Sequence, residues 1–203
     1  MTMMIEDLIR KNRSCRRFYE NQPVSEELLK QLVNLARLSA SAANRQPLKY
    51  ILSWETARNR LIFPALAWAG YLPDWPGPKP GERPAAYIII TGDTTITTNF
   101  WCDHGIAAQS ILLGARQAGL AGCMIGAFDE KRLRSVLAIP EHLRIMLVIA
   151  LGRPKEQIVI EEVGPDGDIK YWRDDSGVHH VPKRRLEDII VDVMETPGRG
   201  KQM

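Results

Sequence analysis

The stretch from Asp103 to Gln117 constrains the fold of this chain more than any other part of the sequence. Apolar residues recur along it at helical spacing and cover more than one face of the helix. They are Ile106, Ala107, Ala108, Ile111, Leu112, Leu113 and Ala115. A helix that is apolar nearly all round is a buried helix, so we expect this one at the centre of a domain, with other elements packed around it.

Two continuous apolar runs predict the main strands of a sheet. Residues 85–91 and 145–151 are apolar in succession over most of their length, as strands buried on both faces are. Shorter runs at 50–52 and 123–125 predict two more strands. The prediction is a sheet of about four or five strands flanked by helices.

Helical periodicity occurs in four further segments, which are 4–11, 26–37, 61–69 and 130–138, and Pro64 interrupts the third of them early. Ser25 and Asp129 have side chains of the type that caps a helix N-terminus, which sets the start of two of these helices. The order of helices and strands gives no regular βαβ units, and no G-x-G-x-x-G follows a strand. The predicted fold class is therefore α+β.

A length of 203 residues suffices for one domain with a good core. We assign residues 1–195 to that domain and 196–203 to a flexible tail. Five of the 13 prolines fall within residues 70–84, so this segment is expected to form a long loop. The last third of the chain has too few apolar residues for a core of its own, and it is expected to wrap the main body or a second subunit.

Composition and charge exclude several classes of function. A hydrophobic fraction of 45% and a charged fraction of 25% are those of an ordinary globular protein, and a net charge of +3 gives no argument for nucleic acid. No apolar run approaches the ~18 residues that span a bilayer. The three cysteines have no CxxC spacing, so neither a disulfide framework nor a zinc site is expected. The expected location is a reducing cytoplasm, with no nucleic-acid or membrane partner.

The segment Arg13–Phe18 contains groups that can hold a phosphate. Arg13, Ser14 and Arg16 offer guanidinium and hydroxyl donors directly after a helix, and planar guanidinium groups match a phosphate dianion. The alternative is a basic helix end, where arginine complements the negative end of the helix dipole. On this segment alone, the helix-end interpretation is favoured.

Two other segments have groups suited to a planar polar ligand. Ser39–Pro47 combines small residues with the amides of Asn44 and Gln46, which both donate and accept hydrogen bonds. A helix end that runs into a turn explains this segment equally well. Gly119–Gly126 has three glycines beside an apolar strand, which indicates close approach of the backbone to a ligand or to a packed helix.

Near the end of the chain a basic triplet, Lys183-Arg184-Arg185, follows His179 and His180. A lone cationic triplet is usually solvated surface. The histidines have no carboxylate or cysteine at ligand spacing, so no metal site is assigned. The sequence contains no recognisable nucleophile–base constellation, and a cofactor is therefore expected to carry any chemistry.

These segments, taken in order, resemble the FMN-dependent nitroreductase family. The motifs that carry the resemblance are Arg13-Ser14-x-Arg16-x-Phe18, Ser41-x-x-Asn44-x-Gln46-Pro47, Asp103-x-Gly105-x-Ala107-x-Gln109 and Gly119-Leu120-x-Gly122-Cys123. The resemblance extends over nearly the whole chain. It implies an α+β sandwich with a central mixed or antiparallel sheet, in a homodimer that exchanges its C-terminal arms and binds FMN at the subunit interface.

The resemblance assigns the N-terminal segment to the cofactor. Arg13, Ser14 and Arg16 are expected to contact the phosphate, the ribityl chain and the pyrimidine side of FMN. Asn12 stands where a second cation often precedes the arginine–serine pair, which leaves this phosphate clamp weaker.

The second and third segments are assigned to the flavin as well. Ser41, Ala42 and Asn44 are expected to reach it from the other subunit. Gly122 and Cys123 are expected to approach the ring through their backbone. The apolar neighbours of Cys123 favour an inert thiol over a nucleophile.

The C-terminal triplet and the loop complete the predicted site. One of Lys183, Arg184 and Arg185 is expected to close on the phosphate, and Arg184 is our choice among them. Tyr71 and Trp75 in the Pro-rich loop have two equal interpretations, a lid over the substrate or inert packing.

The activity implied by the resemblance is oxidoreduction. NADH or NADPH stacks on FMN, passes a hydride to flavin N5 and leaves, and a nitroaromatic, a quinone or a similar small electrophile then takes the electrons. No side chain is required as a catalytic residue. The alternative is a non-catalytic FMN-binding carrier or sensor on the same scaffold.

Overall fold

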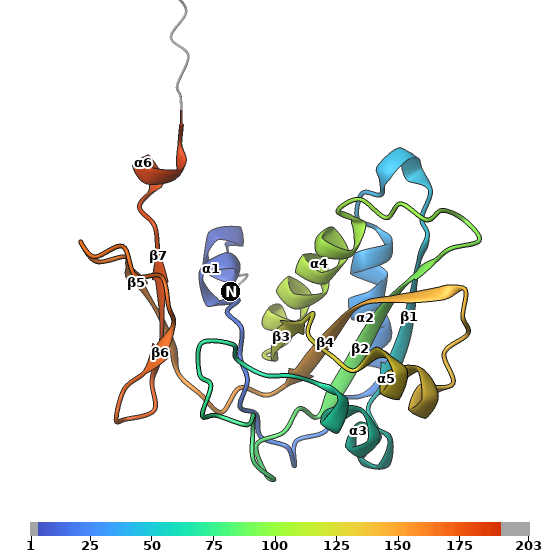
Figure 1. Ribbon diagram of the computed structural model, residues 1–203, viewed down its shortest axis with the longest axis horizontal. Coiled ribbons are helices and arrows are strands. Elements are labelled where there is room, and N and C mark those ends of the chain that lie inside the picture. The colour runs from blue at the N-terminus through green and yellow to red at the C-terminus, as the bar shows by residue number, and fades with distance from the viewer. Residues whose placement is uncertain (1–3, 192–203) are drawn as a thin grey trace, which may run out of the picture.

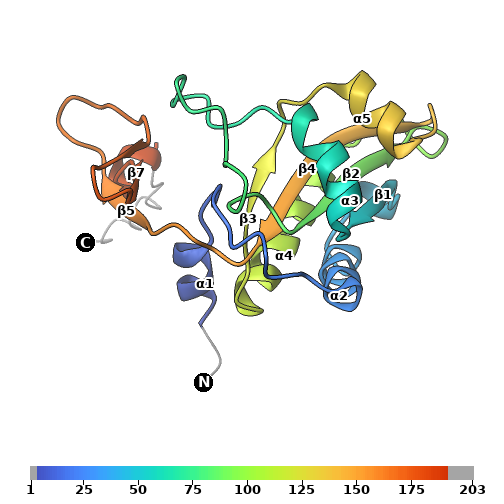
Figure 2. The ribbon, with the colours of Figure 1, turned by 90° about the horizontal axis from the view of Figure 1, so that it is seen from below.

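The computed structural model describes residues 4–191 (Figures 1 and 2). Its α-helices and strands in chain order are α1 (Ile5–Lys11), α2 (Glu26–Arg37), β1 (Leu48–Ser53), α3 (Thr56–Ile62), β2 (Ala86–Asp93), α4 (Asp103–Gln117), β3 (Ala121–Ile125), α5 (Glu130–Leu137), β4 (Leu143–Gly152), β5 (Ile158–Glu162), β6 (Trp172–Arg173), β7 (His179–Lys183) and α6 (Leu186–Ile189). One antiparallel four-stranded sheet has the order β1-β2-β4-β3, and a separate three-stranded sheet has the order β5-β7-β6. The predicted α+β class is confirmed.

Helices cover both faces of the four-stranded sheet (Figure 1). On one face, α2 and α4 pack against Ile88 and Ile90 of β2. On the other face, α3 and α5 pack in a cluster with Tyr87 and Ile89. Alternate residues of a strand point to opposite faces of the sheet. Because helices cover both faces, all 8 residues of β2 are buried. The continuous apolar run therefore is a central strand, as predicted.

The last part of the described chain, residues 158–191, stands apart from this body as a C-terminal arm (Figures 1 and 2). Helix α1 lies between the arm and α4 in both views. The exposed large apolar side chains of the arm include Ile160, Ile169, Trp172, Leu186 and Ile189. At its base, Ile158 packs against the buried Cys15 and Phe18 of the N-terminal segment. Within one chain the arm thus leaves these apolar side chains exposed, and its wrapping of a second subunit stays a prediction.

The structure corrects the helix predicted at 61–69. The helix is α3, which ends at Ile62, and a 3₁₀ turn at Phe63–Ala65 follows it. Pro64 explains the early end, since a proline has no N–H to continue the hydrogen bonds of an α-helix.

Helix α4 has the predicted bounds, but a single chain does not bury it all round. Its inner face is buried at Ala108, Ile111 and Ala115. On its outer face, Gln109 is exposed and Ile106 is half-buried. The sequence predicted a helix covered on most sides. Within one chain, only the inner face of α4 is covered.

Two expectations concern the ends of the chain and the membrane. The tail predicted at 196–203 lies outside the described residues. Among residues 4–191, no helix combines the length and the apolar character needed to cross a bilayer.

A buried ion cluster ties the Pro-rich loop to the N-terminal segment. Glu82 is 4% exposed. Its carboxylate accepts hydrogen bonds from Arg17 Nε and Nη2, both at 2.8 Å, and Lys155 Nζ lies 3.2 Å from it. The hydrogen bonds from Arg17, and then those from Lys155, lower the pKa of Glu82 to about 2. The C-terminal end of the loop is thus held in place by charge as well as by packing.

Replacing Glu82 with glutamine is expected to lower the free energy of unfolding by about 1.5–3 kcal/mol, the loss typical of a charged hydrogen bond. Since the folded-state pKa lies below its ordinary value, the stabilisation is complete above that value and is lost as the pH falls toward about 2. Urea unfolding of the wild type and of Glu82→Gln, at neutral and at acid pH, measures the free energy of unfolding in each case. The wild type should lose more stability on acidification than Glu82→Gln, and equal losses would contradict the assignment.

Candidate functional site

A cleft of about 350 Å³ lies where the N-terminal segment, α4, β3 and the C-terminal arm meet. Its lining residues are Asn12, Arg13, Ser14, Arg16, Gln109, Leu112, Gly122, Met124, Tyr171, His179, Val181 and Lys183. Its size falls within the range of about 300–1,000 Å³ typical of small-molecule sites. The cleft therefore brings together the first and third predicted segments and one residue of the basic triplet.

Gly122 allows the N-terminal segment to reach this position. Cys15 N donates a hydrogen bond to Gly122 O at 3.0 Å, and Ser14 pairs with Gly122 as an isolated parallel bridge. A Cβ atom on Gly122 would lie 2.6 Å from Leu112 Cδ2 and 2.7 Å from Ala150 O. The missing side chain is thus required for packing of β3 against α4 and β4, and Gly122 also lines the cleft.

Arg13 is used partly as a helix-end residue. Its Nε donates to Asn12 O at 2.6 Å and its Nη2 donates to Ile9 O at 2.9 Å, both at the carboxyl end of α1. Burial lowers the pKa of this guanidinium. Asn12 Nδ2 in turn donates to Gln109 Oε1 at 3.5 Å. The helix-end interpretation therefore holds for Arg13, although the side chain also lines the cleft.

Arg16 lies deeper in the cleft and is 9% exposed. Its Nη1 lies 3.3 Å from His179 Nε2 and donates to Ser14 O at 3.4 Å. Its Cζ lies 4.7 Å from the centre of the Tyr171 ring, in cation–π geometry. A guanidinium only donates, so His179 Nε2 accepts and the neutral imidazole carries its proton on Nδ1. Burial, and then the charge of Arg16, lowers the pKa of His179 to about 4.

The part of the cleft lining that the structure describes is cationic. Arg13, Arg16 and Lys183 contribute positive charge, and none of the lining residues among 4–191 is acidic. The nearest buried carboxylate, Glu156, accepts a hydrogen bond from the backbone N of Arg16 and another from Arg173 Nη2 at 3.1 Å. The guanidinium of Arg16 thus remains available to an anionic or carbonyl-bearing ligand.

Alternation along β7 selects which basic residue faces the cleft. His179, Val181 and Lys183 line it, as residues at i, i+2 and i+4 of one strand share a face. Arg184 and Arg185 follow the end of the strand and line a separate hollow beside Asp188. Arg185 is paired there, with its Nη2 3.1 Å from Asp188 Oδ1.

His180 points to the other face of β7. Its ring bonds to Glu161 and lies 3.2 Å from Asp174 Oδ2. It also stacks on Trp172, with ring centres 4.0 Å apart. The pKa of this imidazole is raised, chiefly by the hydrogen bond that its ring donates to the Glu161 carboxylate.

The second predicted segment is held elsewhere, at the start of α4. Ser41 Oγ donates to Asp103 Oδ2 at 2.6 Å, and Ala42 N donates to Asp103 Oδ1 at 3.0 Å. Asn44 adopts a positive φ of 52° in the turn that follows. Ser41 and Asp103 line a different hollow of about 140 Å³. Within one chain, Ser41, Ala42 and Asn44 are therefore not part of the cleft.

The aromatic residues of the Pro-rich loop contact the arm. Tyr71 N donates to Tyr171 Oη at 3.3 Å, and the two rings lie 5.0 Å apart. The Trp75 ring centre lies 4.2 Å from Arg173 Cζ. Neither Tyr71 nor Trp75 lines the cleft, so any effect they have on the cleft is transmitted through the arm.

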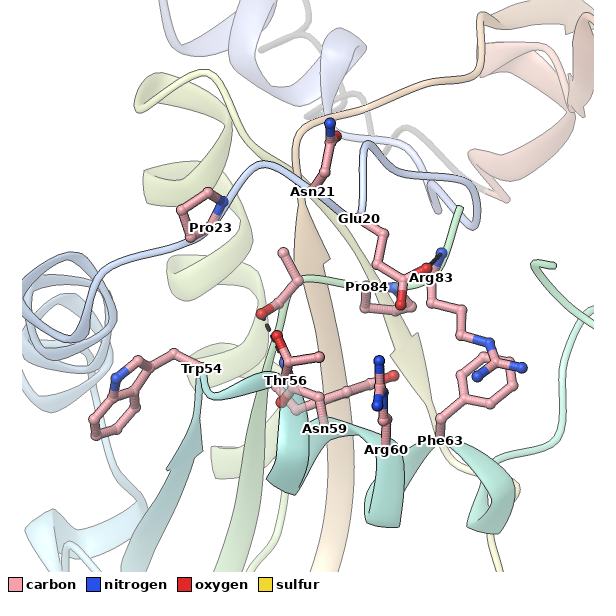
Figure 3. Close-up of a pocket in the computed structure, with 12 residues that line it drawn as sticks. Glu20, Asn21, Pro23, Trp54, Thr56, Asn59, Arg60, Phe63, Arg83 and Pro84 are labelled. Carbon is pink, nitrogen blue, oxygen red and sulfur yellow. Dashed lines mark hydrogen bonds between the residues drawn. The ribbon is translucent and has the colours of Figure 1, made fainter. Parts of the chain in front are cut away.

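A further pocket of about 240 Å³ lies beside α3. Figure 3 shows Arg60 pointing toward its centre and Arg83 lying over the ring of Phe63. The distance from Arg83 Cζ to the centre of that ring is 4.2 Å. Glu20 lies on the same wall. None of the residues predicted from the sequence lines this pocket.

The cleft also contains three polar or aromatic residues that were not predicted as site residues, which are Gln109, Tyr171 and His179. Gln109 stands in one of the recognised motifs, and His179 could have been found from its alternation with Lys183 along one strand. Tyr171 carries no such signal. Cys123 is buried, and burial raises the pKa of its thiol, as expected for an inert cysteine.

The chain has relatives among known proteins. The chain is 31% identical over 161 residues to a Methanothermobacter thermautotrophicus protein described provisionally as an NADH dehydrogenase/NAD(P)H nitroreductase, covering 76% of this chain and 79% of that one. It is 26% identical over 196 residues to the nitrobenzene nitroreductase of Ectopseudomonas oleovorans, covering 73% and 86%.

The fold has a counterpart among solved structures. A nitroreductase-type protein of Exiguobacterium sibiricum, solved in complex with FMN, superimposes with a TM-score of 0.63 at 14% identity, covering 75% of this chain and 89% of the other. Residues 9–153 match the model of the nitroreductase family. The chain therefore belongs to the nitroreductase family.

Proposed function

We propose that this protein is an FMN-dependent NAD(P)H oxidoreductase whose cofactor binds in the cleft between the N-terminal segment and the C-terminal arm. The observation that carries the proposal is the cationic lining. Arg13, Arg16 and Lys183 face a cleft whose walls, as far as residues 4–191 form them, contain no acidic residue. A phosphorylated ligand is favoured in such a site, because guanidinium and ammonium groups bind phosphate through charge-assisted hydrogen bonds.

The remaining lining residues suit the other parts of FMN. Asn12, Ser14 and Gln109 offer amide and hydroxyl groups to a polar chain. Leu112 and Met124 offer apolar contact to a flat ring. The chemistry that bound FMN supplies is hydride transfer through N5, from NADH or NADPH to a nitroaromatic, a quinone or a similar small electrophile.

The side chains of the chain bind and orient. Arg16 would bring a buried positive charge close to a ligand bound in the cleft, and such a charge stabilises negative charge that develops when the ligand is reduced. Lys183 takes the phosphate role in this proposal, since it faces the cleft and Arg184 does not. The buried thiol of Cys123 takes no part.

A second subunit completes the proposed site. Ser41, Ala42 and Asn44 lie away from the cleft of their own chain, which is the arrangement expected if they serve the cofactor of a partner. The exposed Gln109 and the half-buried Ile106 on α4 offer a face for such a partner. The apolar residues of the arm offer another, so exchange of the arms in a homodimer is part of the proposal.

The test is anaerobic reduction of the purified protein. We expect a yellow protein whose flavin absorbance is bleached by NADH or NADPH and recovers when nitrobenzene is added. A yellow protein that neither nucleotide bleaches would support an FMN carrier or sensor in place of an enzyme. A colourless protein that takes up no FMN would contradict both.

A further inference from the structure

Arg16 is held on several sides by the C-terminal arm. His179 Nε2 lies 3.3 Å from its Nη1, and the Tyr171 ring lies 4.7 Å from its Cζ. Within residues 4–191 no carboxylate forms an ion pair with this guanidinium. Its orientation therefore depends on neutral groups that leave its charge uncompensated.

His179 is suited to orient a cation without neutralising it. The residue is 1% exposed, and its Nδ1 has no hydrogen-bond partner among the described residues. Only the neutral imidazole can accept a hydrogen bond from Arg16 at Nε2. The positive charges of Arg16 and Arg173 also disfavour the imidazolium. A lysine or arginine at this position would repel Arg16, and a carboxylate would cancel its charge.

The Pro-rich loop supports the same arrangement from outside the cleft. Tyr71 bonds to Tyr171, whose ring centre lies 5.2 Å from that of His179. Trp75 lies against Arg173, which pairs with Glu156. Tyr71 is thus connected to Arg16 through Tyr171. Trp75 is connected to it through Arg173 and Glu156.

We propose that His179 is a positioning residue that aims the guanidinium of Arg16 into the cleft by accepting its Nη1–H, with Tyr171 as the supporting wall. The inference rests on the proposed function, in which Arg16 meets the flavin. It adds the means by which the orientation is fixed, namely a neutral acceptor on the arm. Loss of the acceptor should let Arg16 turn away without removing its charge from the protein.

The test compares His179→Phe with His179→Gln. Phenylalanine retains a ring against Tyr171 but has no acceptor, whereas the glutamine carbonyl can accept from Arg16. FMN is titrated into each apoprotein, and the midpoint potential of the bound flavin is then measured. For His179→Phe we expect about tenfold weaker FMN binding. A tenfold change in the redox equilibrium corresponds to about 30 mV for a two-electron couple, and the shift should be to lower potential. His179→Gln should recover most of both effects.

A readout without flavin separates this inference from the proposed function. In ¹⁵N NMR spectra of the apoprotein, the Arg16 side-chain N–H signal should be slow to exchange in the wild type and in His179→Gln, and lost in His179→Phe. The Arg16→Lys variant assigns the signal. If His179→Phe does not fold, His179→Ala serves in its place.

The outcomes are distinct. An Arg16 signal that is unaffected in His179→Phe would overturn the positioning role, as would an unchanged midpoint potential. Equal losses in the phenylalanine and glutamine variants would also overturn it, because they would indicate general disruption. A protected Arg16 signal in a protein that binds no FMN would contradict the proposed function and leave the positioning role standing.

Discussion

Replacing Arg16 with alanine is expected to weaken FMN binding by about 10- to 100-fold, the range for loss of a charged hydrogen bond. The side chain is 9% exposed and has a cleft in front of it, and its charge has no acidic partner in the lining. Its removal therefore takes away a group that the fold keeps available for a ligand. Fluorescence titration of FMN into the apoprotein measures the change.

The adjacent arginine provides the matched control. Arg17 is paired with the buried Glu82 and lies outside the lining of the cleft. Arg17→Ala should therefore lower the melting temperature and leave FMN affinity within about twofold of the wild type, since its pairing is structural. If Arg16→Ala left the affinity unchanged, or if both variants reduced it equally, the assignment of Arg16 to the ligand would be wrong.

Replacing Asp103 with asparagine is expected to lower the free energy of unfolding by about 1.5–3 kcal/mol. The carboxylate is buried and accepts from both Ser41 Oγ and Ala42 N. An asparagine can accept at one position only, so one of the two donors loses a charged acceptor. Urea denaturation of both proteins at pH 7 measures the difference.

Asp188 is the control for Asp103, because it is an exposed acid paired with Arg185 at the surface. Asp188→Asn should change stability by less than about 1 kcal/mol, as exposed ion pairs do. The Asp103→Asn variant also tests the second segment. If Ser41, Ala42 and Asn44 serve the cofactor of a partner, FMN affinity should fall with stability. Loss of stability alone would separate this segment from the cofactor.

The parts of the fold that the sequence predicts best are those governed by local periodicity. The bounds of α4 follow from its apolar spacing, and the burial of β2 follows from its unbroken apolar run. The helix expected at 61–69, with an early interruption at Pro64, was wrong in its bounds, because α3 spans Thr56–Ile62 and ends before the proline. The strand β7 was missed because its sequence, His-His-Val-Pro-Lys, contains a proline and little apolar character.

In the site, too, the sequence predicts the features that depend on local pattern and not those that depend on tertiary contacts. The N-terminal segment and Gly122 could be recognised as motifs, but their contact is a tertiary pairing that local pattern does not contain. Which residue of the basic triplet faces the cleft depends on where β7 ends. The strand ends at Lys183, and Lys183 therefore lines the cleft together with His179 and Val181. Arg184, the residue chosen from the sequence, lines a separate hollow, so the proposal assigns the phosphate to Lys183. The position of Tyr171 beside Arg16 depends on how the arm folds back, which no local signal indicates.

The most direct test of the account is a titration of FMN into the apoprotein, carried out for the wild type, Lys183→Ala and Arg184→Ala. We expect the wild type to saturate at one FMN per chain and Lys183→Ala to bind at least about tenfold more weakly. Arg184→Ala should match the wild type, because this residue lines a different hollow. Two results would contradict the placement of FMN in this cleft. One is that Arg184→Ala binds FMN more weakly while Lys183→Ala binds it as tightly as the wild type. The other is that the wild type shows no saturable binding.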